Sequence, residues 1–357
     1  MAGKQPKTEH SADVMAFLGR IYSEKLRRHA CRARTREEWL RWQAEARPAL
    51  LDLLKMPRIA CDCAGHKPGV ELSDAVEDQG GYTRRRGVIE TEPGVRIAFW
   101  MLHPKRTGPL PLAITPHGHE NGDTYVGIWN DAHTRAQVEK EDQDVAVQAV
   151  KRGFLTIAPA TRGINKNPAS FKIADLEGRH RKDCHCHNWY AILAGRTLLG
   201  ERVWDLMRLL DWALTRENVD ASRVLMMGNS GGGMATLHAA ACDPRITTAV
   251  PCGCYNGYVG ADGGLRHCTC NVVPGMMEFG EYWDVAGLVA PRPMLTVNGS
   301  ADPFHGVAEV EDATARLKSV YRAAGAPDNY EHQFGPGAHR FFAAVMWPWV
   351  DSVMRRD

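Results

Sequence analysis

Short apolar runs alternate with longer helix-forming stretches from residue 110 to the end of the chain. A strand buried in a parallel sheet is apolar on both faces, whereas a helix places apolar residues three or four positions apart. The pattern therefore predicts an α/β fold with a mainly parallel central sheet covered by helices on both faces. The expected strands are Leu110–Thr115, Phe154–Ala158, Val224–Met227, Pro291–Gly299 and Tyr330–Phe334, and the expected helices are Trp189–Leu214, Val307–Ala324 and Phe341–Met354.

The N-terminal region has a different pattern. Apolar spacing predicts helices over Ala12–Ala30 and Arg36–Leu54, with a kink or restart of the second helix at Pro48. Thr35 and Glu38 match a capping box, in which each side chain satisfies a backbone N–H at the start of the helix. We therefore expect a helical N-terminal extension over residues 1–80.

Two further strands, Arg86–Ile89 and Arg96–Leu102, are predicted on either side of a turn at Glu90–Val95. They open a main domain over residues 81–357. Two insertions interrupt its rhythm of strands and helices, near 164–188 and 252–274, and both leave the sheet at the edge where substrates usually bind.

The segment Gly228-Asn229-Ser230-Gly231-Gly232 joins the strand Val224–Met227 to a helix-forming stretch and fits the pattern G-x-S-x-G. In this strand–turn–helix motif the serine sits at a strained bend that exposes its Oγ, and the positions two before and two after it must be small. Ser230 is the candidate nucleophile. The alternative is a glycine-rich turn in a chain that contains 34 glycines.

An acid and a base follow in the order that this motif requires. Asp302 comes directly after the strand Pro291–Gly299, and His339 lies in a loop between the last strand and the terminal helix. We expect Asp302 to orient the ring of His339, and His339 to take the serine proton. The alternative for Asp302 is an Asx-turn before Pro303. His305 is too close to Asp302 in sequence to suit the role of base, and His332 falls within a strand.

The loop after the strand Leu110–Thr115 reads Pro-His-Gly-His-Glu-Asn-Gly and is the candidate for the second half of an oxyanion hole. The backbone N–H of Gly231 is the expected first donor, and the backbone N–H of His119, or of a neighbour, the second. His117 and His119 could alternatively be ordinary loop residues or metal ligands, although no carboxylate–histidine helix motif accompanies them.

Together with the segments APRPMLTVNGSADP and GPGAHRFF, these motifs resemble the acetyl-xylan-esterase-like and dienelactone-hydrolase-like branch of the α/β-hydrolases, from about Gly81 to the C-terminus. The resemblance implies an α/β-hydrolase catalytic domain with Ser230 as nucleophile, Asp302 as acid, His339 as base and Gly231 with His119 as oxyanion donors. The helical extension also resembles one carried by esterases of this branch. That branch often has an aromatic residue or glycine where His119 stands.

The expected function is therefore a serine hydrolase that cleaves a carboxylic ester, such as an acetylated sugar or another small ester, through an acyl-enzyme. A lactone hydrolase or peptidase could use the same residues. A hypothesis of another class is a non-catalytic protein on a hydrolase fold that responds to metal or redox state.

That last hypothesis rests on the cysteines, of which the chain has ten. Eight form Cys-x-Cys pairs, and histidines flank the pair at 184/186 and the pair at 268/270. Free thiols, disulfides and a zinc site are all open, although structural zinc sites more often have two to four residues between paired cysteines. We expect no cofactor and no metal.

Composition adds few constraints. The net charge of +2 gives no reason to expect a nucleic acid or a membrane surface as partner. The N-terminus lacks the apolar core of a secretory signal, and no run is long enough to cross a bilayer. We expect a cytoplasmic protein with a small-molecule ester as substrate, and homo-oligomerisation stays open.

Overall fold

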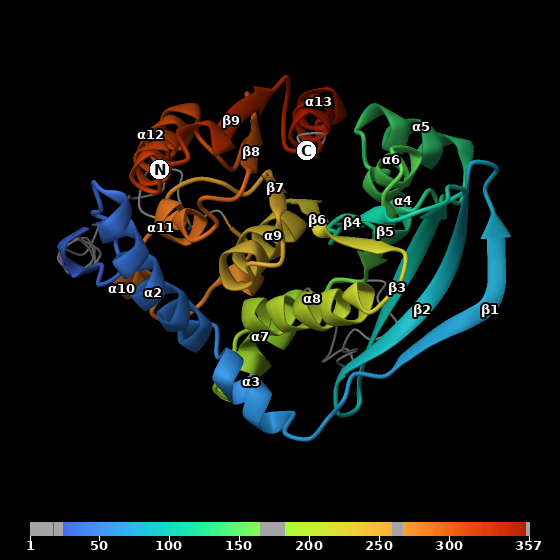
Figure 1. Ribbon diagram of the computed structural model, residues 1–357, viewed down its shortest axis with the longest axis horizontal. Coiled ribbons are helices and arrows are strands. Elements are labelled where there is room, and N and C mark those ends of the chain that lie inside the picture. The colour runs from blue at the N-terminus through green and yellow to red at the C-terminus, as the bar shows by residue number, and fades with distance from the viewer. Residues whose placement is uncertain (1–16, 18–23, 165–182, 259–266, 355–357) are drawn as a thin grey trace, which may run out of the picture.

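The computed structural model describes residue 17 and residues 24–164, 183–258 and 267–354. The strands of these residues form one sheet in the order β1-β2-β3-β5-β4-β6-β7-β8-β9 (Figure 1). Contacts among β1, β2, β3 and β5 are antiparallel, and those from β5 through β4 to β9 are parallel. The strands are β1 (Val70–Asp78), β2 (Tyr82–Glu92), β3 (Val95–Pro104), β4 (Leu110–Ile114), β5 (Leu155–Pro159), β6 (Val219–Asn229), β7 (Thr248–Cys252), β8 (Met294–Gly299) and β9 (Tyr330–Gly335).

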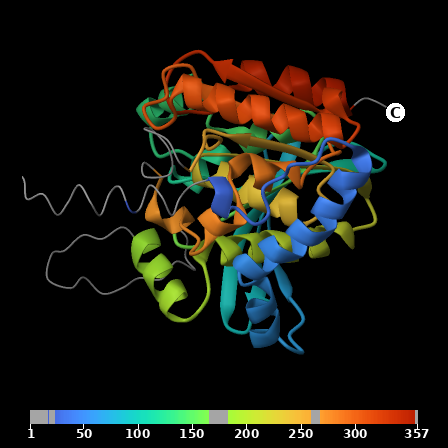
Figure 2. The ribbon, with the colours of Figure 1, turned by 90° about the vertical axis from the view of Figure 1, so that its left-hand side faces the viewer.

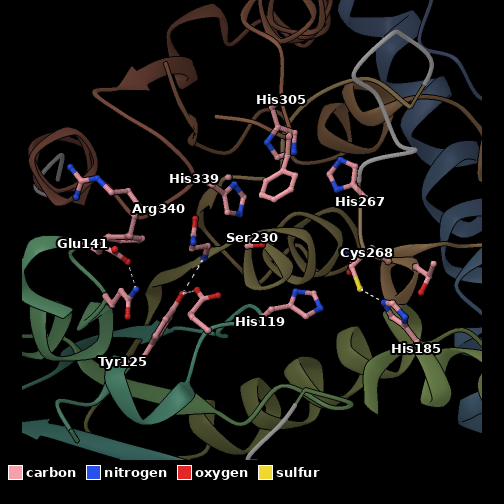
Figure 3. A pocket seen from close by; sticks show the side chains of 18 residues that line it. His119, Tyr125, Glu141, His185, Ser230, His267, Cys268, His305, His339 and Arg340 are labelled. Atoms are coloured by element: carbon pink, nitrogen blue, oxygen red, sulfur yellow. Dashed lines mark hydrogen bonds between the residues drawn. The ribbon is translucent and has the colours of Figure 1, made fainter. Parts of the chain in front are cut away.

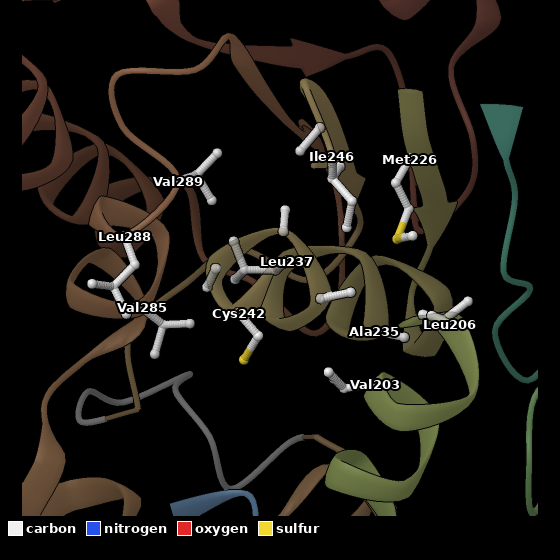
Figure 4. Packing of buried hydrophobic residues seen from close by; sticks show 14 of the residues in the cluster. Val203, Leu206, Met226, Ala235, Leu237, Cys242, Ile246, Val285, Leu288 and Val289 are labelled. Carbon is white, nitrogen blue, oxygen red and sulfur yellow. The ribbon is translucent and has the colours of Figure 1, made fainter. Parts of the chain in front are cut away.

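Helices cover both faces of this sheet, as predicted. Along β6, Val224 and Met226 belong to one apolar core, while Leu225 and Met227 belong to the other, because successive side chains of a strand point to opposite faces. Figure 4 shows part of the first core, where β6 packs on α8 and α9. Helices contributing to the first core are α2 (Arg36–Leu53), α3 (Met56–Asp62), α8 (Leu198–Leu214), α9 (Gly231–Cys242), α10 (Met276–Phe279), α11 (Tyr282–Gly287) and α12 (Val307–Ala323).

The second core lies between the sheet and helices on its other side. These are α4 (Gly122–Tyr125), α6 (Val145–Lys151) and α13 (Ala343–Met354). The elements that remain are the helices α5 (Ala132–Lys140) and α7 (Asp183–Leu193) and the short 3-10 turns η1 (Glu24–Leu26), η3 (Thr269–Asn271) and η4 (Pro327–Asn329).

The N-terminal predictions are confirmed only in part. Helix α2 begins with the expected capping box, in which Thr35 Oγ1 accepts from Glu38 N–H at 3.2 Å, and it continues past Pro48 without a restart. The described end of the predicted helix Ala12–Ala30 is not α-helical. Its backbone bonds instead to the segment around α10, where Arg28 N–H donates to the Glu278 carbonyl at 2.8 Å. The earlier part of that prediction lies almost wholly outside the described residues.

Other element boundaries also differ from the predictions. The expected helix Trp189–Leu214 is two helices, because the chain turns at Gly195, where φ is +73°, and Thr197 caps α8 by accepting from Gly200 N–H. Residues 70–78, within the range assigned to a helical extension, form β1, an antiparallel edge strand paired with β2. Of the two predicted insertions, residues 165–182 and 259–266 lie outside the described residues.

Helix α2 packs on the main domain beside α9 and α11 (Figures 1 and 2). Gln43 Nε2 donates to the Ala290 carbonyl at 2.9 Å, and Arg47 donates to the carbonyls of Ala241 and Leu288 at 3.0 and 2.8 Å. The extension thus completes the first core. Among the described residues, no helix is both long and apolar enough to span a membrane.

Candidate active site

Ser230 occupies the sharp turn between β6 and α9. Its backbone has φ +55° and ψ −119°, a combination that side-chain-bearing residues rarely adopt. The Ser230 N–H donates to the Cys252 carbonyl at 2.8 Å, which ties the turn to the end of β7. A strained residue held by its neighbours, at the carboxyl edge of the sheet, is the geometry expected of an exposed nucleophile.

The glycines around Ser230 are required by close backbone approach. A Cβ at Gly228 or at Gly232 would collide with the carbonyl oxygen of Pro116, in the loop that follows β4. The two positions flank the serine symmetrically, as the motif predicts. Strand, loop and helix therefore meet here at a separation that only glycine allows.

Asp302 and His339 are brought together as predicted. His339 Nδ1 lies 2.8 Å from Asp302 Oδ2, and the Asp302 side chain is fully buried. Burial alone would raise the pKa of the Asp302 carboxyl, but hydrogen bonds from His305 and His339 outweigh it and hold that pKa below its usual value. With Nδ1 donating to an ionised Asp302, Nε2 is the nitrogen of His339 left to accept a proton.

His305 shares the same carboxylate oxygen, which the sequence did not predict. Its Nδ1 lies 3.1 Å from Asp302 Oδ2, and its side chain is 2% exposed against 19% for His339. The Nε2 of His305 is buried and has no hydrogen-bond partner among the described residues. His332 lies within a strand, as predicted, and its Nδ1 is 2.9 Å from Thr296 Oγ1 of the neighbouring strand β8.

The loop that follows β4 lies against the start of α9. A Cβ on Gly118 would come within 3.0 Å of Gly231 N, and one on Gly231 within 3.6 Å of the His119 ring. The backbone of this loop and the first turn of α9 are therefore close enough to serve one oxyanion together. The assignment of the N–H groups of Gly231 and His119 as donors stays a prediction.

A cavity of about 530 Å³ opens between these elements. Ser230, His339 and His119 line it, and Figure 3 shows their side chains around one space. Tyr125 also lines the cavity beside the serine turn, where its hydroxyl donates to Glu120 at 2.8 Å and accepts from Asn229 N–H at 3.3 Å. The remaining lining includes Phe304, His267 and Arg340.

A sequence model of the Abhydrolase family matches residues 23–343, and this range contains the serine turn, Asp302 and His339. The chain belongs to the Abhydrolase family. The match begins before α2, so the matched range includes the helices α2 and α3. A curated relative, "Putative hydrolase YtaP" from Bacillus subtilis (strain 168), is 30% identical over 145 residues. The aligned part covers 39% of this chain and 48% of that protein, about half its length.

Solved structures with the same fold accompany this family match. A "putative acetyl xylan esterase" from Bacteroides fragilis NCTC 9343 superimposes with a TM-score of 0.70 at 19% identity, covering 93% of this chain and 83% of that one. The methylesterase BT1017 gives 0.63 at 21% identity, covering 98% and 67%. A glucuronoyl esterase from Solibacter usitatus gives 0.62 at 15% identity, covering 88% and 93%. The predicted α/β-hydrolase fold is thereby confirmed.

In this Abhydrolase chain, three cysteine thiols and one histidine ring lie close together near the serine turn. We call His119, Cys184, Cys268 and Cys270 the thiol cluster. Their imidazole nitrogen and three sulfur atoms all lie within 4.8 Å of one another. Hydrogen bonds to the thiols of Cys268 and Cys270 raise the pKa of His119 to about 9. All ten cysteines are free of disulfides.

Two features of this Abhydrolase site could not be predicted from the sequence. The sequence argues against His305 as the base, because it is only three residues from Asp302, and does not predict that His305 and His339 share this carboxylate across the tight turn after β8. The convergence of His119 with three cysteines had a signal in the histidine-flanked pairs, but their spacing did not show that α7 and η3 meet the β4 loop.

Proposed function

We propose that this chain is a serine carboxylic-ester hydrolase. The observation that carries the proposal is the 2.8 Å pair between His339 Nδ1 and buried Asp302, which shares one cavity with Ser230 on its strained turn. An oriented histidine beside an exposed serine is the arrangement that activates a hydroxyl for attack on a carbonyl.

In the acylation step, His339 Nε2 takes the proton from Ser230 Oγ as that oxygen bonds to the ester carbonyl carbon. The carbonyl oxygen becomes an oxyanion, and the backbone N–H groups of Gly231 and His119 stabilise it. Loss of one such donor typically costs about 3 kcal/mol of transition-state stabilisation. The tetrahedral intermediate then collapses, and the alcohol leaves with the proton carried by His339.

In the deacylation step, His339 takes a proton from water as the water attacks the acyl-serine. The same oxyanion donors act again, and Ser230 leaves with the returned proton while the acid departs. Asp302 stays ionised throughout, because its two histidine partners hold its pKa low. Its role is to orient His339 and to stabilise the imidazolium.

The substrate class rests on the names of the structural neighbours and on the cavity. Those neighbours carry the names acetyl xylan esterase, methylesterase and glucuronoyl esterase, which share ester chemistry. A cavity of about 530 Å³ falls within the range of roughly 300–1,000 Å³ that small-molecule sites occupy. We propose an acetylated sugar or another small ester as the substrate.

The test is hydrolysis of p-nitrophenyl esters from acetate to octanoate by the wild type and by Ser230→Ala. We expect activity on short acyl chains, and a fall in kcat of about 10⁴-fold or more in the variant, because the acyl-enzyme can no longer form. Ser222→Ala is the matched control. Ser222 lies at the exposed start of the same strand, with its hydroxyl bonded to Asp220.

Retained activity in Ser230→Ala would overturn the nucleophile assignment. A small lactone added to the substrate panel distinguishes the related alternative. Turnover of the lactone without turnover of any open-chain ester would replace the ester hydrolase by a lactone hydrolase that uses the same three residues.

A further inference from the structure

Three of the six separations between the ligand atoms of the thiol cluster match those of a tetrahedral zinc site. His119 Nε2 lies 3.5 Å from Cys184 Sγ and 3.5 Å from Cys270 Sγ, and Cys184 Sγ lies 3.7 Å from Cys268 Sγ. Zinc bonds of about 2.3 Å to sulfur and about 2.05 Å to nitrogen, at tetrahedral angles, place pairs of sulfurs about 3.8 Å apart and sulfur and nitrogen about 3.6 Å apart. The three observed separations fall close to these values.

The surroundings of the cluster suit a negatively charged centre. Three thiolates and one neutral imidazole around Zn²⁺ carry a net charge of −1. Arg202, a buried residue of α8, donates from Nη1 to Cys270 Sγ at 3.4 Å and to Asn271 Oδ1 at 3.2 Å. His185 Nε2 lies 3.3 Å from Cys268 Sγ. Two of the three sulfurs therefore have a nitrogen neighbour able to donate to a thiolate, as the outer partners of metal ligands commonly do.

We propose that His119 Nε2 and the sulfurs of Cys184, Cys268 and Cys270 bind one structural zinc ion. Binding releases to solvent the protons that the thiols and the His119 ring carry, and it involves no change of oxidation state. All four positions are filled by protein, so the ion has no open position for water or substrate and its role is structural. This inference goes beyond the proposed function, and zinc content tests it without any assay of activity.

The ion would join three segments that are distant in sequence. His119 belongs to the loop after β4, Cys184 to the first turn of α7, and Cys268 and Cys270 to the segment at η3. Because Gly118 and the ring of His119 lie beside Gly231 in the first turn of α9, fixing that ring also restrains the loop whose N–H we assign to the oxyanion hole. Zinc would thus hold one wall of the cavity at the position that catalysis needs.

A disulfide explains the same contacts less well. One bond between Cys184 and Cys268 would leave Cys270, which accepts from the buried guanidinium of Arg202, as a lone thiol. It would also leave unexplained why His119 Nε2 lies 3.5 Å from the sulfurs of both Cys184 and Cys270. A buried cation beside a sulfur indicates a thiolate, which a metal ion stabilises and a disulfide lacks.

The test is elemental analysis of the full chain, purified without chelator or affinity metal, for the wild type, Cys184→Ser, Cys270→Ser and Cys61→Ser. Cys61 is exposed at the end of α3 and is the matched control. We expect one zinc per chain in the wild type and in Cys61→Ser, and less than a tenth of that in the other two. Replacement of zinc by Co²⁺ in the wild type should add the visible and near-ultraviolet bands of a tetrahedral cobalt–thiolate centre.

The cobalt spectrum requires no variant, so it keeps the test decisive if a serine variant fails to fold. Absence of bound zinc together with absence of cobalt–thiolate bands would overturn the proposal. A Cys184–Cys268 disulfide, identified by mass spectrometry of the unreduced protein, would also overturn it. Neither result would affect the esterase proposal, which depends on Ser230.

Discussion

The Ser230 side of the cavity and the thiol cluster beside it differ in how the fold assembles them. Ser230, Asp302 and His339 each follow the carboxyl end of a parallel strand, β6, β8 and β9 in turn, so the sheet itself sets their separations. The thiol cluster has one ligand on such a loop and three on α7 and η3, which are not strands of the sheet. A site positioned by the sheet can be recognised from sequence order. A site positioned by helices packed outside it needs coordinates.

The largest expected effect separates the two histidines that share Asp302. His339→Ala should lower kcat about 10⁴-fold, because it removes the proton acceptor of Ser230. His305→Ala should lower kcat by about tenfold or less, since its ring is buried and acts only through Asp302. Steady-state kinetics on the best p-nitrophenyl ester measures both values. The reverse ranking would make His305 the base.

The next expected effect is on the acid stability of the contact between α7, which carries Cys184, and α8. Oε2 of Glu201 on α8 lies 2.8 Å from Nε2 of His187 on α7, within hydrogen-bond distance. Burial alone would raise the Glu201 pKa, but the hydrogen bond from His187 and the charge of Arg162 lower it to about 2 from an ordinary 4.5. A lowered folded-state pKa means that this stabilisation is present above about pH 4.5 and is lost as pH falls toward 2.

Glu201→Gln removes that titration. Urea unfolding at pH 5 and at pH 3 should show a smaller acid-induced loss of unfolding free energy in the variant than in the wild type, by about 1–3 kcal/mol. Equal losses in the two proteins would show that Glu201 does not carry the acid sensitivity of the α7–α8 contact.

An effect of similar size is expected from the close approach at the serine turn. Gly232→Ala should lower the free energy of unfolding by about 1–3 kcal/mol, because the added methyl group collides with the Pro116 carbonyl. Gly69→Ala is the control, since a Cβ there meets nothing within 4 Å and its φ is not positive. Thermal and urea unfolding compare the two variants. Equal stability would mean that the turn can widen without cost.

The parts of this molecule that could be predicted are those governed by local rules. The parallel strands follow from apolar runs, the start of α2 from the Thr35 capping box, and the serine turn from its glycine spacing. The parts that could not be predicted depend on partners distant in sequence. Residues 27–30 leave the predicted helix because their backbone pairs with the Glu278 and Phe279 carbonyls. The helix predicted over Trp189–Leu214 is interrupted near Thr197, whose hydroxyl donates a hydrogen bond to the Leu54 carbonyl at 3.1 Å.

The docking of α2 has a consequence for synthesis of the chain. Arg47 must reach the carbonyl of Leu288, which is made 241 residues later. At about 5–20 residues per second, the ribosome takes roughly 10–50 s to supply that partner. During this interval Trp39, Ala46 and Leu50, which are buried in the finished core, lack the partners that α10 and α12 supply. The nascent chain therefore carries a helix whose apolar face is incompletely covered through most of translation, and elongation speed contributes to how long that face is open to aggregation.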